Sequence, residues 1–334
     1  MNRAAIEPLA VPQKTGSKLV SIILVNYNCR QYVEALSACL QNQTYSHLEI
    51  LVFDNGSNDG SLEKIKQFFP QARIFELGEN TGFSKPNNLG ISESRGAYIL
   101  CLNFDVVLEK TFVEEMVNAI ETDKQIGWVA GKMLKLTNGG KSKKIDCLGH
   151  HMLKSRYARE LDYSKPFTWN DYAKRQFVFG ASACAALYRK EMLHDIALNG
   201  EYFDEDFFAY FEDVDLDWRA QHRNWKCLYT PQAIGYHVRY GTNLIKNKQI
   251  AAYYLSNRIF MMIKNDDWKH CMRDIVPISL QFIRDFITYT VMNPRALALA
   301  LSRIVRLYPK MCTKRVRIFA TRKTSRNYMR SLIR

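Results

Sequence analysis

The chain has 334 residues, of which 47% are apolar and 24% charged, so it can bury one large core or one core with an appendage. Its eight cysteines lie far apart with no close pair, which excludes a zinc knuckle or a redox dithiol and suits a reducing compartment. Residues 1–18, interpreted as an N-terminal tail, have no continuous apolar stretch behind a basic start. The sequence therefore predicts no signal peptide and a cytoplasmic protein.

The formal net charge of +14 is concentrated near the C-terminus. From Phe286 to the last residue there is no Asp or Glu, whereas twelve cations occur there. They are Arg295, Arg303, Arg306, Lys310, Lys314, Arg315, Arg317, Arg322, Lys323, Arg326, Arg330 and Arg334. Electrostatic attraction of an anionic partner is therefore expected mainly at this end of the chain.

The first hundred residues read as alternating strands and helices. Continuous β-branched runs at 20–25 and 48–53 predict buried parallel strands, and the helical spacing of apolar residues over 32–43 places a helix between them. The same pattern predicts helices at 62–69 and 87–94 and strands at 72–77 and 97–102. These βαβ units predict an α/β domain whose strand ends deliver polar side chains to one edge.

The pattern loosens after residue 110. It predicts a helix over 111–121, a strand over 126–131, a basic loop over 138–144 and a buried strand over 177–187. The pair His150-His151 lacks the spacing of a metal site and is interpreted as surface loop.

Two acids and a histidine that follow strands are candidates for chemistry. Asp54 follows a strand and can accept the ring N–H of a uracil or thymine base, although a tight turn with a helix cap explains it equally well. Asp105 also follows a buried strand and can join diphosphate oxygens around Mg²⁺ or Mn²⁺, or can simply cap a helix. His237 follows a further strand-like segment and can hold metal or phosphate, or be structural.

The pair Glu212-Asp213 lies in a segment that combines many acids with many aromatic residues. A transfer to a hydroxyl needs a base within hydrogen-bond reach of that hydroxyl, and aromatic neighbours would partly desolvate such a base. The alternative is an exposed acidic helix start, which the helix dipole favours. The aromatic neighbours favour the functional interpretation.

Taken together, these segments resemble glycosyltransferase family 2, whose members have the GT-A fold, and within it the bacterial rhamnosyltransferase-like branch that builds polysaccharide on lipid carriers. The resemblance covers about residues 19–243 and rests on the order and spacing of short motifs. They are Ser21-Ile-Ile-Leu-Val-Asn-Tyr-Asn28, Val52-Phe-Asp-Asn-Gly-Ser-Asn-Asp-Gly-Ser61, Asn80-Thr-Gly-Phe83, Asn87-Asn-Leu-Gly-Ile91, Leu102-Asn-Phe-Asp-Val106, Gly180-Ala181 and Tyr210-Phe-Glu-Asp-Val-Asp-Leu216 with Arg219.

The resemblance implies a role for each matching position. The residues expected around the nucleotide-sugar are Asn26, Tyr27, Asp54, Asn55, Ser57, Asn80, Gly82, Phe83, Asn88 and Asn103. Asp105, with His237, is expected to hold Mg²⁺ or Mn²⁺. Asp213 corresponds to the catalytic base, and Glu212 supports the acceptor side.

Two departures from the family pattern stand out. The metal triplet reads Asn103-Phe104-Asp105, without its first acid, so weak metal affinity is expected. Lys85-Pro86 stands where relatives often carry two small residues. A nucleotidyltransferase is disfavoured because Asn26-Tyr27-Asn28 is not a glycine-rich phosphate loop.

The resemblance implies an inverting, metal-dependent transfer of L-rhamnose from dTDP-L-rhamnose to a saccharide on polyprenyl diphosphate, in the synthesis of a cell-surface polysaccharide such as O-antigen. A UDP-sugar is the alternative donor. The implied GT-A domain spans residues 19–250, with a nucleotide-binding half at 19–110 and an acceptor half at 111–250.

Residues 251–334 are expected to form a basic, amphipathic helical region on the inner face of the cell membrane. The apolar stretch 275–301 is broken by Pro277, Arg284, Asp285, Pro294 and Arg295, which disfavours a membrane-spanning helix. The open alternatives are a helical cap on the catalytic domain and a non-catalytic basic protein that binds membrane or nucleic acid. No nucleic acid is expected as a partner of the enzyme.

Overall fold

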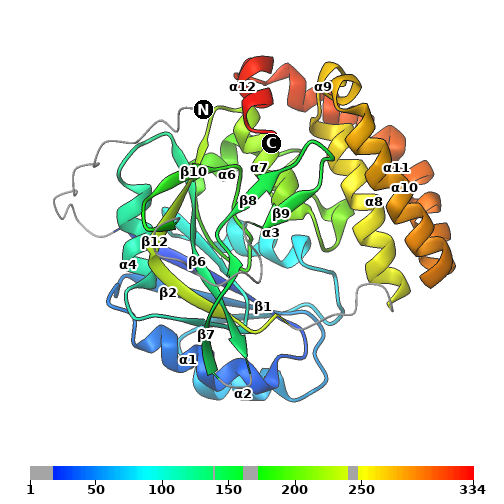
Figure 1. Ribbon diagram of the computed structural model, residues 1–334. Coiled ribbons are helices and arrows are strands. Elements are labelled where there is room, and N and C mark those ends of the chain that lie inside the picture. The colour runs from blue at the N-terminus through cyan, green and yellow to red at the C-terminus, as the bar shows by residue number, and fades with distance from the viewer. Residues whose placement is uncertain (1–17, 138–139, 161–171, 240–246) are drawn as a thin grey trace.

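The computed structural model describes residues 18–137, 140–160, 172–239 and 247–334 (Figure 1). A curled central sheet has the strand order β10-β12-β6-β11-β4-β1-β2-β3, and β5 and β7 pair with β12 and β6. Its strands are β1 (Val20–Asn26), β2 (Leu48–Asp54), β3 (Arg73–Glu76), β4 (Tyr98–Leu102), β5 (Val106–Leu108), β6 (Ile126–Thr137), β7 (Gly140–Cys147), β10 (Gln176–Val178), β11 (Ala185–Arg189) and β12 (Lys226–His237). A small antiparallel pair joins β8 (His150–Met152) to β9 (Ala158–Glu160).

The strands predicted in the first hundred residues form the parallel part of this sheet. β1 pairs in parallel with β2 on one side and β4 on the other, and β2 pairs with β3. The register sets Asn26 at the end of β1 opposite Asp54 at the end of β2. The βαβ prediction is therefore confirmed, and the carboxyl ends of these strands share one edge.

The second half of the sheet mixes directions, and two sequence predictions were wrong here. The predicted loop at 138–144 falls largely in β7, which extends β6 as an antiparallel hairpin, although residues 138–139 lie outside the described residues. Its lysines are mostly exposed, as on a solvent-facing ribbon, so the basic composition did not signal a strand. The predicted strand 177–187 is two strands, β10 and β11, separated by residues 179–184 with a turn at 183–184.

Helices cover both faces of the sheet because successive strand residues alternate between two cores. Ile22 lies in one core with residues of α1 (Val33–Gln41) and α4 (Phe112–Ile120). Ile23 lies in the other with residues of α3 (Ser84–Glu93), α6 (Lys190–Ile196) and α7 (Glu212–His222). α2 (Ser61–Phe68) packs beside α1.

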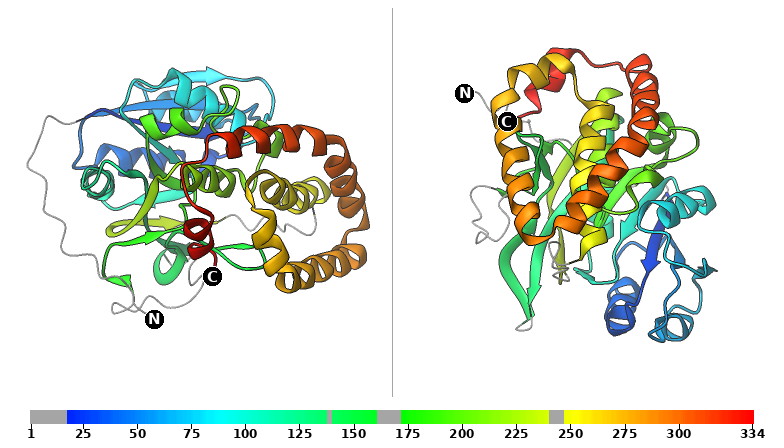
Figure 2. Two further views of the ribbon diagram at one scale, coloured as in Figure 1. Left: turned by 90° about the horizontal axis from the view of Figure 1, so that it is seen from above. Right: turned by 90° about the vertical axis from the view of Figure 1, so that its right-hand side faces the viewer.

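The C-terminal helices form a separate group at one side of the sheet (Figures 1 and 2). They are α8 (Lys248–Asn265), α9 (Trp268–Arg273), α10 (Ile275–Met292), α11 (Pro294–Ala320) and α12 (Arg326–Ser331). α8 contacts α7 and α11, and α10 is on the outside (Figure 2). Across the described ranges, we find no helix with both the length and the apolar content to cross a bilayer.

Candidate active site

A closed set of polar side chains connects the ends of β1 and β2. The amide nitrogen of Asn26 donates to Asp54 Oδ1 at 2.6 Å, to Ser61 Oγ at 2.8 Å and to Ser57 Oγ at 2.9 Å. The backbone N–H of Ser57 donates to Asp54 Oδ2 at 3.2 Å. Asp54 does not cap α2, whose N-cap is Gly60. Each carboxylate oxygen can accept a further hydrogen bond, so Asp54 retains capacity for a ligand donor.

The loop of residues 80–83 is held against the end of β2 by Asn55. The Asn55 amide donates to Asn80 Oδ1 at 3.0 Å and to the Gly82 carbonyl at 2.8 Å, and its oxygen accepts from the Thr81 backbone. Gly82 has φ of +88°, and a Cβ there would lie 2.4 Å from the Phe208 carbonyl. That carbonyl also accepts from the Phe83 N–H at 2.5 Å, so this loop contacts the segment that precedes α7.

Three other residues expected around the nucleotide-sugar differ in their exposure and in their hydrogen-bond partners. Tyr27 follows β1 with 48% of its surface exposed, so its ring is available to a ligand. The backbone N–H of Asn103 donates to the Cys184 carbonyl. Asn88 is buried and its amide bonds the backbone of Tyr202 and Phe203, which joins α3 to that segment.

Asp105 and His237 lie together at the same edge of the sheet. His237 Nε2 is 3.3 Å from Asp105 Oδ2, and its Nδ1 is 2.9 Å from a carboxylate oxygen of the buried Asp146. Burial opposes protonation of His237, but Cys184 and hydrogen bonds with Asp105 and Asp146 outweigh it and raise its pKa well above the usual value. Asp146 was not recognised in the sequence because it lies 91 residues before His237.

The Asp105–His237 pair fits a divalent cation whose remaining coordination positions are filled by the substrate and water. Among the described residues, no group of three or more His, Cys, Asp or Glu side chains could hold a metal ion. Mg²⁺ and Mn²⁺ commonly take one or two protein ligands and fill the remaining positions with phosphate oxygens and water. A carboxylate that bonds the second ring nitrogen of a metal-binding histidine, as Asp146 bonds His237, also fixes the orientation of the ring.

Glu212 and Asp213 begin α7, as the acidic motif suggested. Asp213 Oδ2 accepts from the Ala183 backbone at 3.2 Å, and the side chain is 16% exposed, so it reaches a surface that a substrate can approach. Glu212 is buried, and burial together with the charge of Asp213 raises its pKa well above the usual value. Two neighbouring acids in different environments can take different roles, and Asp213 is the more accessible of the two.

The interpretation of His150-His151 as surface loop was wrong. Both side chains are buried, and His150 Nδ1 lies 2.8 Å from Asp217 Oδ2 on α7. The backbone of His150 pairs with that of Gly180, so β8 lies against this part of the site although the two residues are distant in the sequence. The spacing of the two histidines excluded a metal site, but it could not predict a hydrogen bond to a distant carboxylate.

The segment 204–211 before α7 has several positive φ angles and is held by hydrogen bonds from α8. Phe208, Tyr210 and Phe211 all have positive φ, a conformation costly for residues with a side chain. The Asn257 amide on α8 donates to the backbone carbonyls of Phe207, Ala209 and Tyr210. A residue of the C-terminal helices therefore holds the loop that leads to Asp213.

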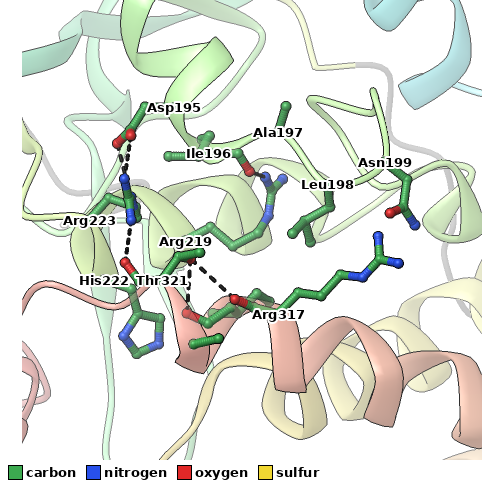
Figure 3. A pocket seen from close by; sticks show the side chains of 12 residues that line it. Asp195, Ile196, Ala197, Leu198, Asn199, Arg219, His222, Arg223, Arg317 and Thr321 are labelled. Atoms are coloured by element: carbon green, nitrogen blue, oxygen red, sulfur yellow. Dashed lines mark hydrogen bonds and ion pairs between the residues drawn. The ribbon is translucent and has the colours of Figure 1, made fainter.

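Buried ion pairs strengthen the same support. Lys264 Nζ lies 2.5 Å from Asp204 and 2.7 Å from Asp215, and Lys314 Nζ lies 2.5 Å from Asp204. Arg223, which follows α7, bonds Asp195 and the carbonyl of Thr321 at the end of α11 (Figure 3). α8 and α11 thus form the helical cap that was an open alternative.

Contacts link these groups into one site. Residues 183–184 touch Asp213 through the Ala183 N–H, Asn103 through the Cys184 carbonyl, and His237 through Cys184. Phe208 contacts the loop of residues 80–83 through its backbone carbonyl. The donor-side residues, the Asp105–His237 pair and the start of α7 therefore surround one region at the carboxyl ends of the strands.

Comparison with known proteins identifies the relatives of this chain. A Mycobacterium tuberculosis N-acetylglucosaminyl-diphospho-decaprenol L-rhamnosyltransferase is 22% identical over 269 residues, which are 75% of this chain and 86% of that protein. An uncharacterised glycosyltransferase of Haemophilus influenzae is 32% identical over 111 residues, and the match spans only 34% of its length.

Solved structures with a similar fold are also glycosyltransferases. GalNAc-T7 with UDP, GalNAc and Mn²⁺ has a TM-score of 0.60 at 14% identity, and the match covers 75% of this chain and 48% of that one. The mannosyltransferase PcManGT from Pyrobaculum calidifontis, with GDP-Man and Mn²⁺, has a TM-score of 0.55 at 13% identity. The match covers 90% of this chain and 85% of that one. The fold is thus the expected GT-A fold. The family model of glycosyl transferase family 2 matches residues 21–197, and the chain belongs to this family.

Proposed function

We propose that the protein is an inverting, metal-dependent glycosyltransferase that moves L-rhamnose from dTDP-L-rhamnose to a saccharide on polyprenyl diphosphate, in the synthesis of a bacterial cell-surface polysaccharide. The observation that carries the chemistry is the grouping of Asp213 and the Asp105–His237 pair around residues 183–184. This provides a base on one side and a place for a leaving diphosphate on the other. A UDP-sugar donor is the alternative.

The proposed reaction is a single displacement. Asp213 takes the proton of the acceptor hydroxyl while that oxygen forms the new bond to the anomeric carbon and the bond to the nucleotide diphosphate breaks. Attack opposite the leaving group inverts the anomeric centre. A divalent metal, Mg²⁺ or Mn²⁺, would neutralise charge on the diphosphate when bound by Asp105 and His237. Asn26, Asp54 and the loop of residues 80–83 bind and orient the nucleotide.

The choice of donor and acceptor rests on the mycobacterial relative, whose name gives a rhamnosyl transfer to N-acetylglucosaminyl-diphospho-decaprenol. Its match extends over 75% of this chain, beyond the 21–197 segment of the family model. Both solved neighbours contain Mn²⁺, one with UDP and GalNAc and the other with GDP-Man, which supports a divalent metal in the same fold.

A thermal-shift screen of nucleotide-sugars tests the donor. With Mn²⁺ present, dTDP-L-rhamnose is expected to raise the melting temperature more than UDP- or GDP-sugars, because a ligand that binds only the folded state stabilises it. Asp105→Ala is expected to remove the Mn²⁺-dependent part of the shift, since the metal would lose a carboxylate ligand. Glu109→Ala, which removes an exposed acid on the same part of the chain, is the matched control.

Transfer is then measured with decaprenyl-diphosphate-linked N-acetylglucosamine as acceptor, and the anomeric configuration of the product is read by NMR. A product that retains the donor configuration contradicts the inverting mechanism. An equal Mn²⁺-dependent shift in Asp105→Ala and the parent protein contradicts the metal assignment. A larger shift with a UDP-sugar favours the alternative donor.

We further propose that α10 and the first part of α11 dock on an anionic bilayer at its cytoplasmic face. Fifteen of the eighteen large apolar side chains that are exposed among the described residues lie at Trp268 or beyond. One row along α10, the membrane-facing stripe, consists of Val276, Leu280, Ile283, Ile287 and Val291, each 54% exposed or more. This helix lies on the outer side of α8, away from the sheet (Figure 2).

The charge of this region supports an anionic partner, although less of it is available than the sequence suggested. Seven of the twelve C-terminal cations bond to acids or carbonyls of the protein: Arg303, Lys310, Lys314, Arg315, Arg322, Arg326 and Arg330. The other five are exposed: Arg295, Arg306, Arg317, Lys323 and Arg334. Each cation held near an anionic bilayer contributes about 1 kcal/mol, and salt screens this part.

The variant Leu280→Glu/Ile287→Glu is expected to lose flotation with vesicles that contain phosphatidylserine, because two carboxylates would enter the apolar layer. The parent protein should float at low salt and be only partly released at high salt, since apolar burial is not screened. Phe177→Glu, which changes an exposed aromatic on β10, is the matched control and should float. Equal flotation of the double variant and the parent protein refutes the docking surface.

A further inference from the structure

His150 is held in one orientation by backbone contacts on the edge of the site. It begins β8, where its N–H donates to the Gly180 carbonyl at 2.8 Å and its carbonyl accepts from the Phe179 N–H at 3.1 Å. Its side chain is only 5% exposed. The preceding Gly149 has φ of +106°, and a Cβ there would meet the Gly180 carbonyl at 2.9 Å. The backbone thus brings the imidazole close to the first turns of α7.

Asp217 fixes the ring from the other side. Its Oδ2 lies 2.8 Å from His150 Nδ1, its Oδ1 accepts from the Ala181 N–H at 3.3 Å, and its side chain is fully buried. A Cβ on Gly180 would lie 1.7 Å from Asp217 Oδ2, so no other residue could occupy this position beside that carboxylate. The close approach of β8, Gly180 and α7 therefore fixes the histidine–carboxylate pair in place.

The second ring nitrogen faces the proposed base. His150 Nε2 is 3.9 Å from Asp213 Oδ2, one turn of α7 before Asp217. We propose that His150, oriented by Asp217, is a positioning residue for the proposed base Asp213. The role rests on the proposed function, because it concerns the group that takes the acceptor proton. His150 acts through Asp213 and needs no contact with the sugar.

Electrostatics explain why the base needs such a neighbour. Glu212, Asp213 and Asp217 lie within two turns of one helix, and His150 is the group that can carry positive charge among them. Burial raises the pKa of Asp217 to about 7, while His150 lowers it. The ring, held by Asp217, thus presents Nε2 to the Asp213 carboxylate, which restricts the positions that the proposed base can take.

The test compares His150→Gln and Asp217→Asn with the parent protein, using dTDP-L-rhamnose, Mn²⁺ and decaprenyl-diphosphate-linked N-acetylglucosamine. His150→Gln is expected to lower kcat about 10- to 100-fold, as loss of an orienting neighbour does at other sites, with little change in donor affinity. The pH dependence of kcat/KM is recorded for each protein, because a change in the surroundings of the base alters it whereas a purely structural change does not.

Asp217→Asn should lower kcat in the same way, and His151→Gln, on the opposite face of β8, is the matched control. Folding of each variant is checked by circular dichroism and by donor binding. If folded His150→Gln and Asp217→Asn both keep the parent kcat and pH profile, the inference is overturned. A parent protein without transfer would instead remove the proposed function, and an active Asp213→Asn would remove the base assignment alone.

Discussion

Asp213→Asn is expected to abolish transfer and leave donor binding intact. The amide has nearly the shape of the carboxylate and can keep the contact with the Ala183 backbone only by turning its oxygen toward it. It cannot accept the proton of the acceptor hydroxyl, and the loss of a general base commonly costs about 10²- to 10⁴-fold in rate. The measurements are kcat with the rhamnosyl donor and donor affinity by calorimetry.

Glu212→Gln is the matched control for this substitution. Burial and the charge of Asp213 raise the pKa of Glu212, which favours the neutral carboxyl, so an amide of the same size is a mild change at this position. The loss of turnover should be much smaller than for Asp213→Asn. If the two variants lost activity equally, Asp213 would not be the residue that takes the proton. Near-normal turnover of Asp213→Asn would exclude it outright.

Lys264→Met is expected to give the largest loss of stability among single substitutions of the C-terminal helices. Lys264 is fully buried between Asp204 and Asp215, and its removal leaves two buried carboxylates with fewer partners. Breaking a buried pair in this way costs about 3–5 kcal/mol. Lys314 on Asp204 and Arg219 on Asp215 remain, so the lower part of that range is expected.

The free energy of unfolding in urea measures this effect, and Lys310→Met provides the comparison. Lys310 pairs with Asp206, but the lysine is 51% exposed, and such pairs contribute about 1 kcal/mol or less. Equal losses in the two variants would show that the buried network contributes no more than a surface pair.

Acid should weaken the same network. Burial opposes ionisation of Asp204 and Asp215, but Lys264 and neighbouring cations hold the pKa of both carboxyls below the usual value. A carboxyl whose pKa is lower in the folded state stabilises the fold at neutral pH and loses that contribution as pH falls below about 4. The unfolding free energy of the parent protein should therefore fall more steeply below this pH than that of Lys264→Met.

The first half of the fold was predictable because its signals are local. Continuous β-branched runs gave β1 and β2, and the polar residues that follow them lie at the expected edge. Turn-rich segments such as 54–61 were correctly placed between a strand and a helix. Hydrophobic periodicity reports burial within one element, and these elements are buried in the ordinary way.

The parts that escaped prediction depend on partners distant in sequence. Lys264 lies 60 residues from Asp204, and Lys314 lies 110 residues from it, so both read as members of a solvated basic region. His150 meets Asp217 across 67 residues, and its burial is set by Gly180. Pairings of this kind depend on the folded topology, and no local pattern of charge or spacing carries them.

The support of segment 204–211 by α8 limits how this protein can be recombined with its relatives. Asn257 recognises three backbone carbonyls of a loop whose shape depends on positive φ at Phe208, Tyr210 and Phe211. A chimaera that joined this catalytic part to foreign C-terminal helices would lose that match together with the lysine partners of Asp204. Segment 204–211 and the helices behind it must therefore be exchanged as one unit, even though the chain between them contains a complete strand, β12.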